Sequence, residues 1–252
     1  MVFVSSKQRV CHVCGYPAQP DANYCINCGA KLEKAVKPLS KENFLSVANS
    51  RWLRWAAVAF LIELVIFFAL SSLPMSAQTA QTYASGGKQL VDSVRNQPLF
   101  LRILAIFENN FRIASIELVP FFGVVFFGVS TYQTAQIIEA FGINSSLNGP
   151  ILMLSLLFLP HSWLELPAYA VATYQGLLLS VSIFRKRFFQ ELGRTLFVLL
   201  IVGVELFVAA IFEGVEITLQ NYGSILPLVT WLPFFVIAGL VYNLIKKVRQ
   251  KI

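Results

Sequence analysis

Long apolar runs alternate with short polar segments over most of this chain. A run of about 20 residues is long enough to cross the roughly 30 Å apolar core of a bilayer as one helix. A longer run, residues 151–184, exceeds one crossing and is interrupted by Pro160 and Pro167, which predicts two helices or half-helices joined there. The remaining runs of spanning length cover residues 55–73, 111–138, 195–219 and 225–245. We therefore expect an all-α polytopic membrane protein with about six membrane helices, one pair of them broken at Pro160–Pro167.

The segments between these runs predict connections. Residues 75–98 are polar and lack a long apolar run, so they predict a loop outside the membrane. From Leu99 to Phe107 apolar residues recur at helical spacing. This pattern is typical of a short interfacial amphipathic helix or of the leading turns of the next span.

Composition and charge agree with a membrane protein. Of the 252 residues, 56% are hydrophobic and 13% are charged, whereas a soluble domain has about a quarter of its residues charged. The net charge of +7 follows from the positive-inside rule and does not favour nucleic acid. If the N-terminus is inside, the basic segments 7–54, 185–194 and 246–251 all face inward. We expect a multi-pass protein of the cell membrane with cytoplasmic N- and C-termini.

The four cysteines form two copies of the pattern Cys-x2-Cys-Gly, Cys11 to Gly15 and Cys25 to Gly29. Two intervening residues let both sulfurs reach one metal ion, and the glycine tolerates the positive φ that such a turn often requires. Together the two turns supply four thiolates, a complete tetrahedral structural zinc site. A pair of disulfides is the alternative, which a reducing cytoplasm disfavours. We expect one structural Zn²⁺ ion bound by Cys11, Cys14, Cys25 and Cys28.

The cysteine segment is expected to form a domain of its own. We predict a zinc ribbon over residues 1–34, a linker over 35–50 and a multi-helix transmembrane domain over 51–252. His12 is expected to face solvent, and Tyr16 and Tyr24 to cover the small core, because so short a segment buries little surface without metal. The segment Ala22–Leu32 resembles the short zinc-ribbon family found at the termini of archaeal and bacterial membrane proteins. This resemblance implies a structural or protein-binding module. Nucleic acid is an unlikely partner, since the ribbon has few basic residues and no aromatic stripe.

Several glutamates fall in or near the apolar spans. A charge at the bilayer centre costs about 2.5–3.5 kcal/mol, and no lysine or arginine lies deep in a predicted span. These side chains are therefore expected to be protonated, to face water or to form hydrogen bonds between helices. A proton or cation path is the functional interpretation, and packing by interhelical hydrogen bonds is the structural one. The glutamates are Glu63, Glu117, Glu165, Glu205, Glu213 and Glu216.

His161 and Glu165 are four residues apart, beside the proline break. On a helix they share one face, and broken helices at membrane depth often line substrate sites in transporters. The break is therefore a candidate ligand or ion site, to which a metal could bind only with further ligands.

The string Pro160-His-Ser-Trp-Leu-Glu-Leu-Pro-Ala168, followed by Gly176, resembles the signature of the stage II sporulation protein M family of membrane proteins. Asn109-Asn110-Phe-Arg112 and Ala209–Glu213 are similar to other parts of that family, and the resemblance covers roughly residues 50–245. It implies a non-enzymatic membrane scaffold, since the namesake anchors a septal cell-wall-degrading complex. The added ribbon is familiar among archaeal relatives that do not sporulate, so the sporulation role is not carried over. The residues expected to matter are Asn110, His161, Glu165, Pro167 and Glu213, with Glu205 as a further member of the intramembrane polar site.

Two functions stay open. The first is a membrane scaffold or anchor whose cytoplasmic ribbon recruits a cytoplasmic or membrane protein partner. The alternative is a transporter or channel for ions, protons or lipid that uses His161, Glu165 and the other carboxylates. The sequence contains no phosphate-binding loop, nucleophile elbow or metalloprotease motif, so no enzyme is expected. The partners are the lipid bilayer and a protein, and a homo-oligomer is compatible with the sequence.

Overall fold

The computed structural model describes residues 9–11, 13–18, 22–32 and 50–250. The chain divides into two compact units, Met1–Val47 and Ala48–Ile252. His12 and all of the predicted linker except Ser50 lie outside the described residues.

The N-terminal unit is a small ribbon built from two similar turns. Strand β1 (Arg9–Val10) pairs antiparallel with β2 (Pro17–Ala18) across the first turn. In each turn the glycine has positive φ, +71° at Gly15 and +70° at Gly29, and its N–H donates to the carbonyl of the first cysteine. The core consists of Cys11, Cys25 and Leu32, with three alanines packed around them. Tyr16 and Tyr24 are 41% and 60% exposed, so the expectation that they cover this core is wrong.

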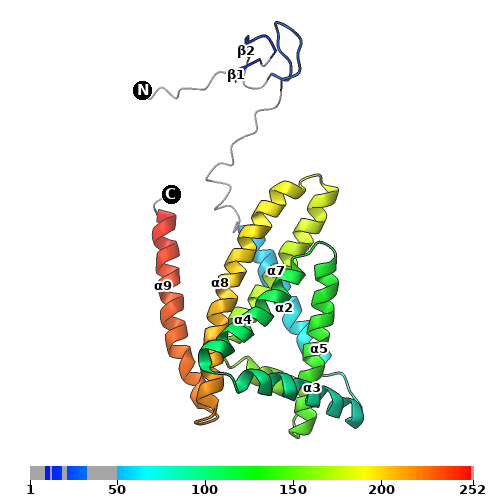
Figure 1. Cartoon of the computed structure of the whole chain (residues 1–252), viewed down its shortest axis with the longest axis vertical. Coiled ribbons are helices and arrows are strands. Elements are labelled where there is room, and N and C mark those ends of the chain that lie inside the picture. The colour runs from blue at the N-terminus through cyan, green and yellow to red at the C-terminus, as the bar shows by residue number, and fades with distance from the viewer. Residues whose placement is uncertain (1–8, 12, 19–21, 33–49, 251–252) are drawn as a thin grey trace. The chain divides into compact units, whose positions relative to one another are not determined.

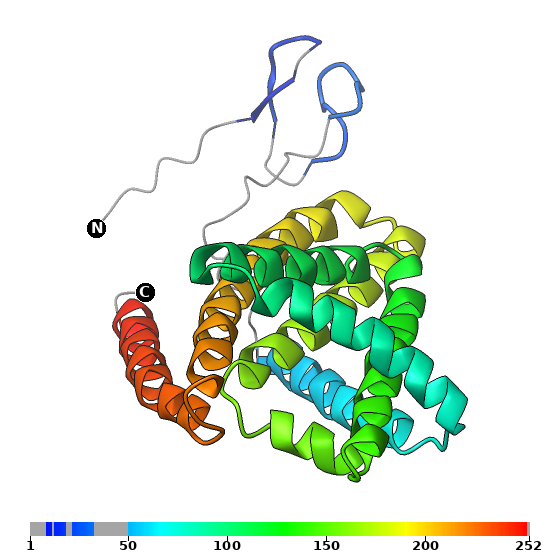
Figure 2. The ribbon, with the colours of Figure 1, turned by 60° about the horizontal axis from the view of Figure 1, so that its bottom comes forward.

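The C-terminal unit is entirely helical in its regular structure (Figure 1). Helix α7 packs against α8, α2 and α4, and α4 also packs against α8, so α7 and α8 form the centre. Figure 2 shows the same helices with the lower end of the unit turned forward. The elements are α2 (Ser50–Ser71), α3 (Ala77–Arg95), α4 (Leu99–Glu117), α5 (Phe122–Asn144), α6 (Gly149–Leu156), α7 (Ser162–Phe184), α8 (Phe188–Gln220), the 3-10 helix η2 (Leu226–Thr230) and α9 (Trp231–Gln250).

Four helical segments in the described part of the chain are long and apolar enough to cross a membrane. They are Arg51–Ser71, Ser162–Phe184, Phe188–Gln220 and Leu226–Asn243. The prediction of an all-α, multi-pass membrane protein with an N-terminal ribbon is confirmed. Of the about six expected membrane helices, four satisfy these criteria, and the expected span 111–138 is not among them.

The segment predicted as an outer loop contains helix α3, so that prediction is wrong. The Ser76 hydroxyl caps the helix by accepting a hydrogen bond of 3.1 Å from the Thr79 N–H. One face of α3 buries Ala80, Ala84 and Gly87, and the helix packs against α5. In Figure 1, α3 lies across the lower end of the unit. A face of small residues carries little hydropathy, which explains why the sequence pattern suggested a loop.

The predicted second span is divided at Pro120. Helix α4 ends at Glu117 and α5 begins at Phe122, with a tight turn between them in which the Phe122 N–H donates to the Pro120 carbonyl at 2.7 Å. Phe121 has φ of +63°, a conformation that bulky residues rarely adopt. Its N–H is held by the Ser180 hydroxyl of α7 at 2.8 Å. The apolar repeat from Leu99 to Phe107 forms the first half of α4.

The break at Pro160 is confirmed, whereas Pro167 does not end a helix. Helix α6 ends at Leu156 and α7 begins at Ser162, with Pro167 inside α7. Helices α5 and α7 each follow such a proline break and are 23 residues long. Each is followed by a left-handed residue, Ser146 and Lys186, and by an equivalent N–H···O hydrogen bond of 2.9 Å back to the helix. The membrane unit thus contains two broken helix pairs of similar build, α4–α5 and α6–α7.

Candidate functional site

The four cysteines of the ribbon have the geometry of a metal site. All four sulfurs lie within 4.8 Å of one another. The Cys11 and Cys28 sulfurs are 3.7 Å apart, and those of Cys14 and Cys25 are 3.6 Å apart. A disulfide requires about 2.05 Å, whereas a tetrahedral zinc ion with Zn–S bonds of about 2.3 Å has sulfur–sulfur edges of about 3.8 Å. The residues therefore fit one zinc ion with no open coordination position.

Hydrogen bonds within the turns lower the pKa of some of these cysteines and so favour their thiolate form. The backbone N–H of Tyr16, with help from neighbouring side chains, lowers the pKa of Cys14 to about 6. At Cys28 the Ala30 N–H acts in the same direction, but the neighbouring Cys14 sulfur and desolvation outweigh it and raise the pKa to about 12. Four thiolates this close are stable together only with a cation between them. The ribbon holds one structural Zn²⁺ ion.

A second cluster of ionisable groups lies in the membrane unit at the α6–α7 break. His161 ends the break with helical φ and ψ of −57° and −38°, and Glu165 follows one turn later on α7. Glu213 comes from the neighbouring helix α8. The nearest ligand atoms of His161, Glu165 and Glu213 all lie within 4.8 Å of one another. The sequence predicted each residue separately, and the packing of α7 on α8 brings them together.

Hydrogen bonds from α8, η2 and α4 orient this cluster and add Glu216 to it. His161 Nδ1 is hydrogen-bonded to Glu216 Oε2. Thr230 Oγ1 of η2 donates to the other oxygen of Glu216 at 3.0 Å. Asn110 Nδ2 of α4 donates to Glu165 Oε1 at 2.5 Å. Sequence reasoning named Glu216 only as a carboxylate in a span and missed Thr230, although the i, i+3 spacing of Glu213 and Glu216 placed them on one face of α8.

Glu205 does not belong to the cluster. It lies eight residues before Glu213 on α8, about 12 Å along the helix axis. Within the described residues it forms no hydrogen bond or ion pair, and its carboxylate is not among the groups that lie within 4.8 Å of one another at the break. Its inclusion in the predicted polar site is therefore not supported by the packing.

The charges of the cluster do not balance. His161, Glu165, Glu213 and Glu216 would carry a net charge of −2 if all four were ionised. In the described part of the chain, no lysine or arginine forms an ion pair with these carboxylates. An unbalanced charge in a low-dielectric interior is very costly. The cluster must therefore hold protons or a bound cation to be neutral.

A second pair of carboxylates is buried more deeply, between α2, α4 and α7. Glu63 of α2 and Glu117 at the end of α4 are each 1% exposed. Thr173 Oγ1 of α7 donates to Glu117 Oε2 at 3.3 Å. Glu63 Oε2 is buried and has no hydrogen-bond partner in the described structure. The sequence placed both residues in spans but could not show that they lie near one another.

Two other buried charges have structural roles. Glu139 accepts a hydrogen bond of 2.6 Å from the Gly149 N–H and so caps the start of α6, where the helix dipole favours a negative charge. Arg102, buried on α4, donates to carbonyls at the ends of α3 and α8, among them that of Gly214 at 3.2 Å. Arg102 also donates to the Thr218 hydroxyl at 2.9 Å. Because their partners are mostly backbone groups at helix ends, we assign both residues a structural role.

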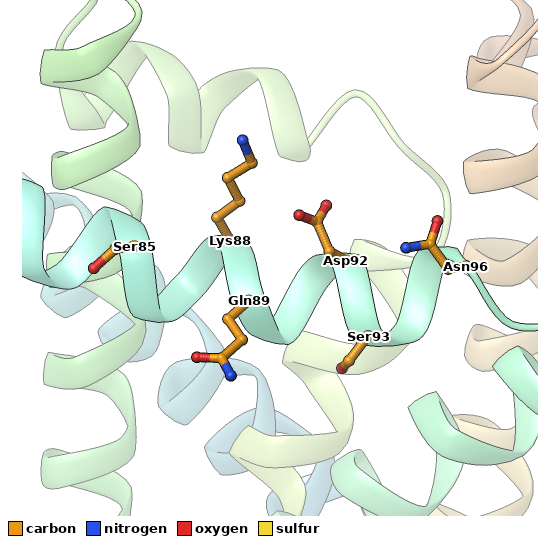
Figure 3. Close-up of a pocket in the computed structure, with 6 residues that line it drawn as sticks. All are labelled: Ser85, Lys88, Gln89, Asp92, Ser93 and Asn96. Carbon is orange, nitrogen blue, oxygen red and sulfur yellow. The ribbon is translucent and has the colours of Figure 1, made fainter.

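Two surface hollows of the membrane unit do not bring together side chains that could form a binding or catalytic site. One lies on α3, where the side chains fan out on different sides of the helix (Figure 3). Its lining consists of Ser85, Lys88, Gln89, Asp92, Ser93 and Asn96. Another is an apolar groove between α4 and α8, lined by residues such as Phe107, Phe111 and Phe207. The carboxylate clusters remain the best candidates.

Comparison with known proteins agrees with both units. Residues 56–216 match the family described as Stage II sporulation protein M, and residues 10–32 match the zinc-ribbon domain. No curated protein and no solved structure gives a match. The first match covers more than half of the chain and includes the break at Pro160, His161 and all six glutamates of the apolar spans. The chain therefore belongs to the stage II sporulation protein M family, and it carries a zinc ribbon before its membrane domain.

Proposed function

We propose that the membrane domain binds and moves a cation, the proton included, through the cluster of His161, Glu165, Glu213 and Glu216. The observation that carries this proposal is the uncompensated negative charge of the cluster at a break between two helices. A purely structural cluster needs no excess of carboxylates, because a neutral amide or hydroxyl forms the same interhelical hydrogen bonds at lower cost. An ionisable cluster inside a membrane domain is by default a functional hypothesis.

The surroundings of the cluster support exchange of a cation. Glu165 lies in the first turn of α7, where the positive end of the helix dipole stabilises its ionised form. His161 and Glu216 are buried, whereas Glu165 and Glu213 are partly exposed. The cluster therefore combines two buried groups with two less buried carboxylates beside a helix break, an arrangement that resembles the ion sites of transporters built around broken helices.

Reconstitution of the purified protein into liposomes tests this proposal. Fluorescent indicators for protons and for Na⁺, K⁺ and Mg²⁺ would report flux. We expect Glu165→Gln to lower the flux at least tenfold. Glu108→Gln is the matched control, because Glu108 is an exposed glutamate on α4. Absence of any cation flux in the wild-type protein, or equal flux in Glu165→Gln, contradicts the proposal.

A scaffold that recruits a protein partner through the ribbon is the second candidate. The residues between the paired cysteines project apolar side chains, with Val13 64% and Ile26 82% exposed. Tyr16 and Tyr24 add to this exposed apolar surface. A metal-bound ribbon that exposes these apolar side chains is suited to bind a partner protein through an apolar patch on that partner. We expect deletion of residues 1–34, or the pair Val13→Ser and Ile26→Ser, to abolish co-purification of that partner, and unchanged co-purification would count against it.

Neither candidate requires an enzyme, and we propose that the chain is not one. Ser162 Oγ lies 3.4 Å from His161 Nε2, which suggests a nucleophile beside a base. The Ser162 hydroxyl, however, donates to the Leu156 carbonyl at 2.9 Å. Its proton is thus directed to the backbone rather than to the imidazole, unlike that of an activated serine.

A further inference from the structure

We infer that the ion moved by this domain is the proton, and that it travels along α7 between the His161 cluster and the buried pair Glu63–Glu117. This inference rests on the proposed function, and it adds the identity of the ion and its route. Four features of the structure support it. They are the spacing of polar side chains on α7, the carboxylates at the two ends of this series, Tyr169 between them, and the apolar side chains that surround Tyr169.

Polar side chains recur every fourth residue along α7. Neighbouring members of the series His161, Glu165, Tyr169 and Thr173 lie one turn apart, so the four form a stripe that winds slowly around the helix, by about 40° per step. Twelve residues at 1.5 Å per residue extend over about 18 Å. This distance is more than half of the roughly 30 Å apolar core of a bilayer.

Each end of this stripe reaches carboxylates from other helices. At one end His161 is hydrogen-bonded to Glu216 of α8. At the other end the Thr173 hydroxyl donates to Glu117 at 3.3 Å. Glu63 lies near enough to Glu117 to interact with it electrostatically, and its Oε2 atom is buried without a partner in the described structure. Since the Glu63 residue is only 1% exposed, this oxygen needs a proton or an ion to offset its desolvation.

Tyr169 lies between the two groups of carboxylates. On α7 it follows Glu165 by one turn and precedes Thr173 by one turn. It is also near enough to the carboxylates of both groups to interact with them electrostatically. The other residues between Glu165 and Thr173 are all apolar. Tyr169 therefore supplies the polar side chain of α7 between the two sites.

The lining around Tyr169 selects the proton over a metal ion. Tyr169 packs against the apolar cluster that contains Phe67, Ile138 and Leu166. These side chains offer no oxygen to a metal ion that has lost its water, so between the carboxylates at the two ends such an ion would have too few ligands to replace its hydration shell. A proton needs only a hydroxyl group that accepts on a lone pair while it donates its own hydrogen.

The transfer leaves every group with its normal number of bonds. The O–H bond of protonated Glu165 breaks as its proton binds the phenol oxygen of Tyr169. The original phenol proton passes to the Glu117 carboxylate, directly or through one water molecule. Glu165 becomes a carboxylate, Glu117 becomes a carboxylic acid, and Tyr169 ends neutral. Rotation of the phenol hydroxyl restores the starting orientation.

Proton flux into liposomes that contain a pH-sensitive dye tests the route. Valinomycin and a K⁺ gradient would set the membrane potential, and thermal unfolding in detergent would show that each variant is folded. Tyr169→Phe removes only the hydroxyl and keeps the ring, and we expect it to lower the proton flux at least tenfold. Tyr132→Phe, at a position that is 42% exposed on α5, is the matched control and should conduct like the wild type. Thr173→Val should also lower the flux, and Thr173→Ser should restore it.

The outcomes separate this inference from the proposed function. If Glu165→Gln abolishes proton flux while folded Tyr169→Phe conducts like the wild type, the route is wrong and the proposed function stands. If the wild type moves Na⁺, K⁺ or Mg²⁺ but no protons, the choice of ion is wrong and the cation site stands. If the wild type moves no cation, the proposed function and this inference both fail. Loss of flux in Tyr169→Phe with full flux in Tyr132→Phe supports the route.

Discussion

Asn110 on α4 donates a hydrogen bond of 2.5 Å to Glu165 on α7, and so joins residues 55 positions apart at the centre of the membrane domain. We expect Asn110→Ala to lower the free energy of unfolding by about 1.5–3 kcal/mol, because the carboxyl group of Glu165 loses its donor. Asn110→Asp should destabilise more, since it adds a fourth acidic group. Unfolding in mixed detergent micelles, followed by tryptophan fluorescence, measures both. Glu108→Ala, an exposed position on α4, is the control, and an Asn110→Ala variant as stable as the control would contradict this role.

Gly176 of α7 lets that helix approach the end of α4. A Cβ atom at position 176 would lie 2.4 Å from the Glu117 carbonyl oxygen. Since backbone cannot move aside as a side chain can, Gly176→Ala should cost about 1–3 kcal/mol of stability. Gly128 is the matched control, because a Cβ there meets nothing within 4 Å. Gly128→Ala should be neutral or stabilising by up to about 1 kcal/mol, and similar melting temperatures for both variants would show that the close approach is unimportant.

Gln175 joins three helices near the basic loop. Its side chain is fully buried, accepts from Trp52 Nε1 of α2 at 3.2 Å, and donates to Glu191 and Thr195 of α8 at 2.8 and 3.0 Å. Gln175→Leu keeps the side-chain volume but removes the amide group from its three hydrogen-bond partners. We therefore expect the free energy of unfolding to fall by about 1–3 kcal/mol. Gln133→Leu, on the exposed face of α5, should change the stability little. Equal unfolding curves for the two variants would argue against the network.

Zinc binding by the ribbon should depend on pH. The pKa of Cys14 is lowered to about 6 and that of Cys28 is raised to about 12 in the metal-free site. At pH 7, therefore, Cys14 is mostly thiolate already, while Cys28 must lose its proton when zinc binds. Acid restores that proton and opposes binding, so the affinity should fall at least tenfold for each unit of decreasing pH between 8 and 6. Competition with a chromogenic chelator measures it, and an affinity independent of pH would contradict thiolate ligation.

Both termini are expected on the cytoplasmic side. The loop Arg185–Arg187 and the tail with Lys246 and Lys247 are basic, and basic residues stay inside. In a variant without the four ribbon cysteines, single cysteines placed at Lys186 and Lys247 should react with a membrane-impermeant maleimide only after the cells are opened. Lys88 of α3 is the control position that should react from outside. Labelling of the first two positions in intact cells would reverse the topology.

The sequence was informative wherever structure depends on neighbours in the chain. The Cys-x2-Cys-Gly turns close through hydrogen bonds only four residues long, as at Gly15 and Gly29, so their spacing alone predicted the ribbon and its metal. The apolar run lengths predicted a helical membrane unit because backbone groups in lipid must be paired within one segment. Pro160 ended a helix as expected, since proline cannot donate to the preceding turn.

Errors arose where neighbours in space outweigh the local pattern. The α3 face of Ala80, Ala84 and Gly87 is too small to stand out in hydropathy, yet it fits closely on α5. Pro120 lies in an apolar run that looked continuous, and the turn around it is held by Ser180, 59 residues away from Phe121. Neither contact leaves a signal in a window of local sequence.

The sequence by itself determined that this chain enters a membrane, binds zinc through four cysteines and carries too many acidic groups for its apolar spans. The tertiary structure alone decided which acidic groups meet. It brought Asn110, His161, Glu165 and Glu213 together, left Glu205 apart, and placed Glu63 with Glu117. The physical reason is that helix formation and metal turns use hydrogen bonds between near neighbours, whereas the choice of facing side chains depends on how distant helices pack against each other.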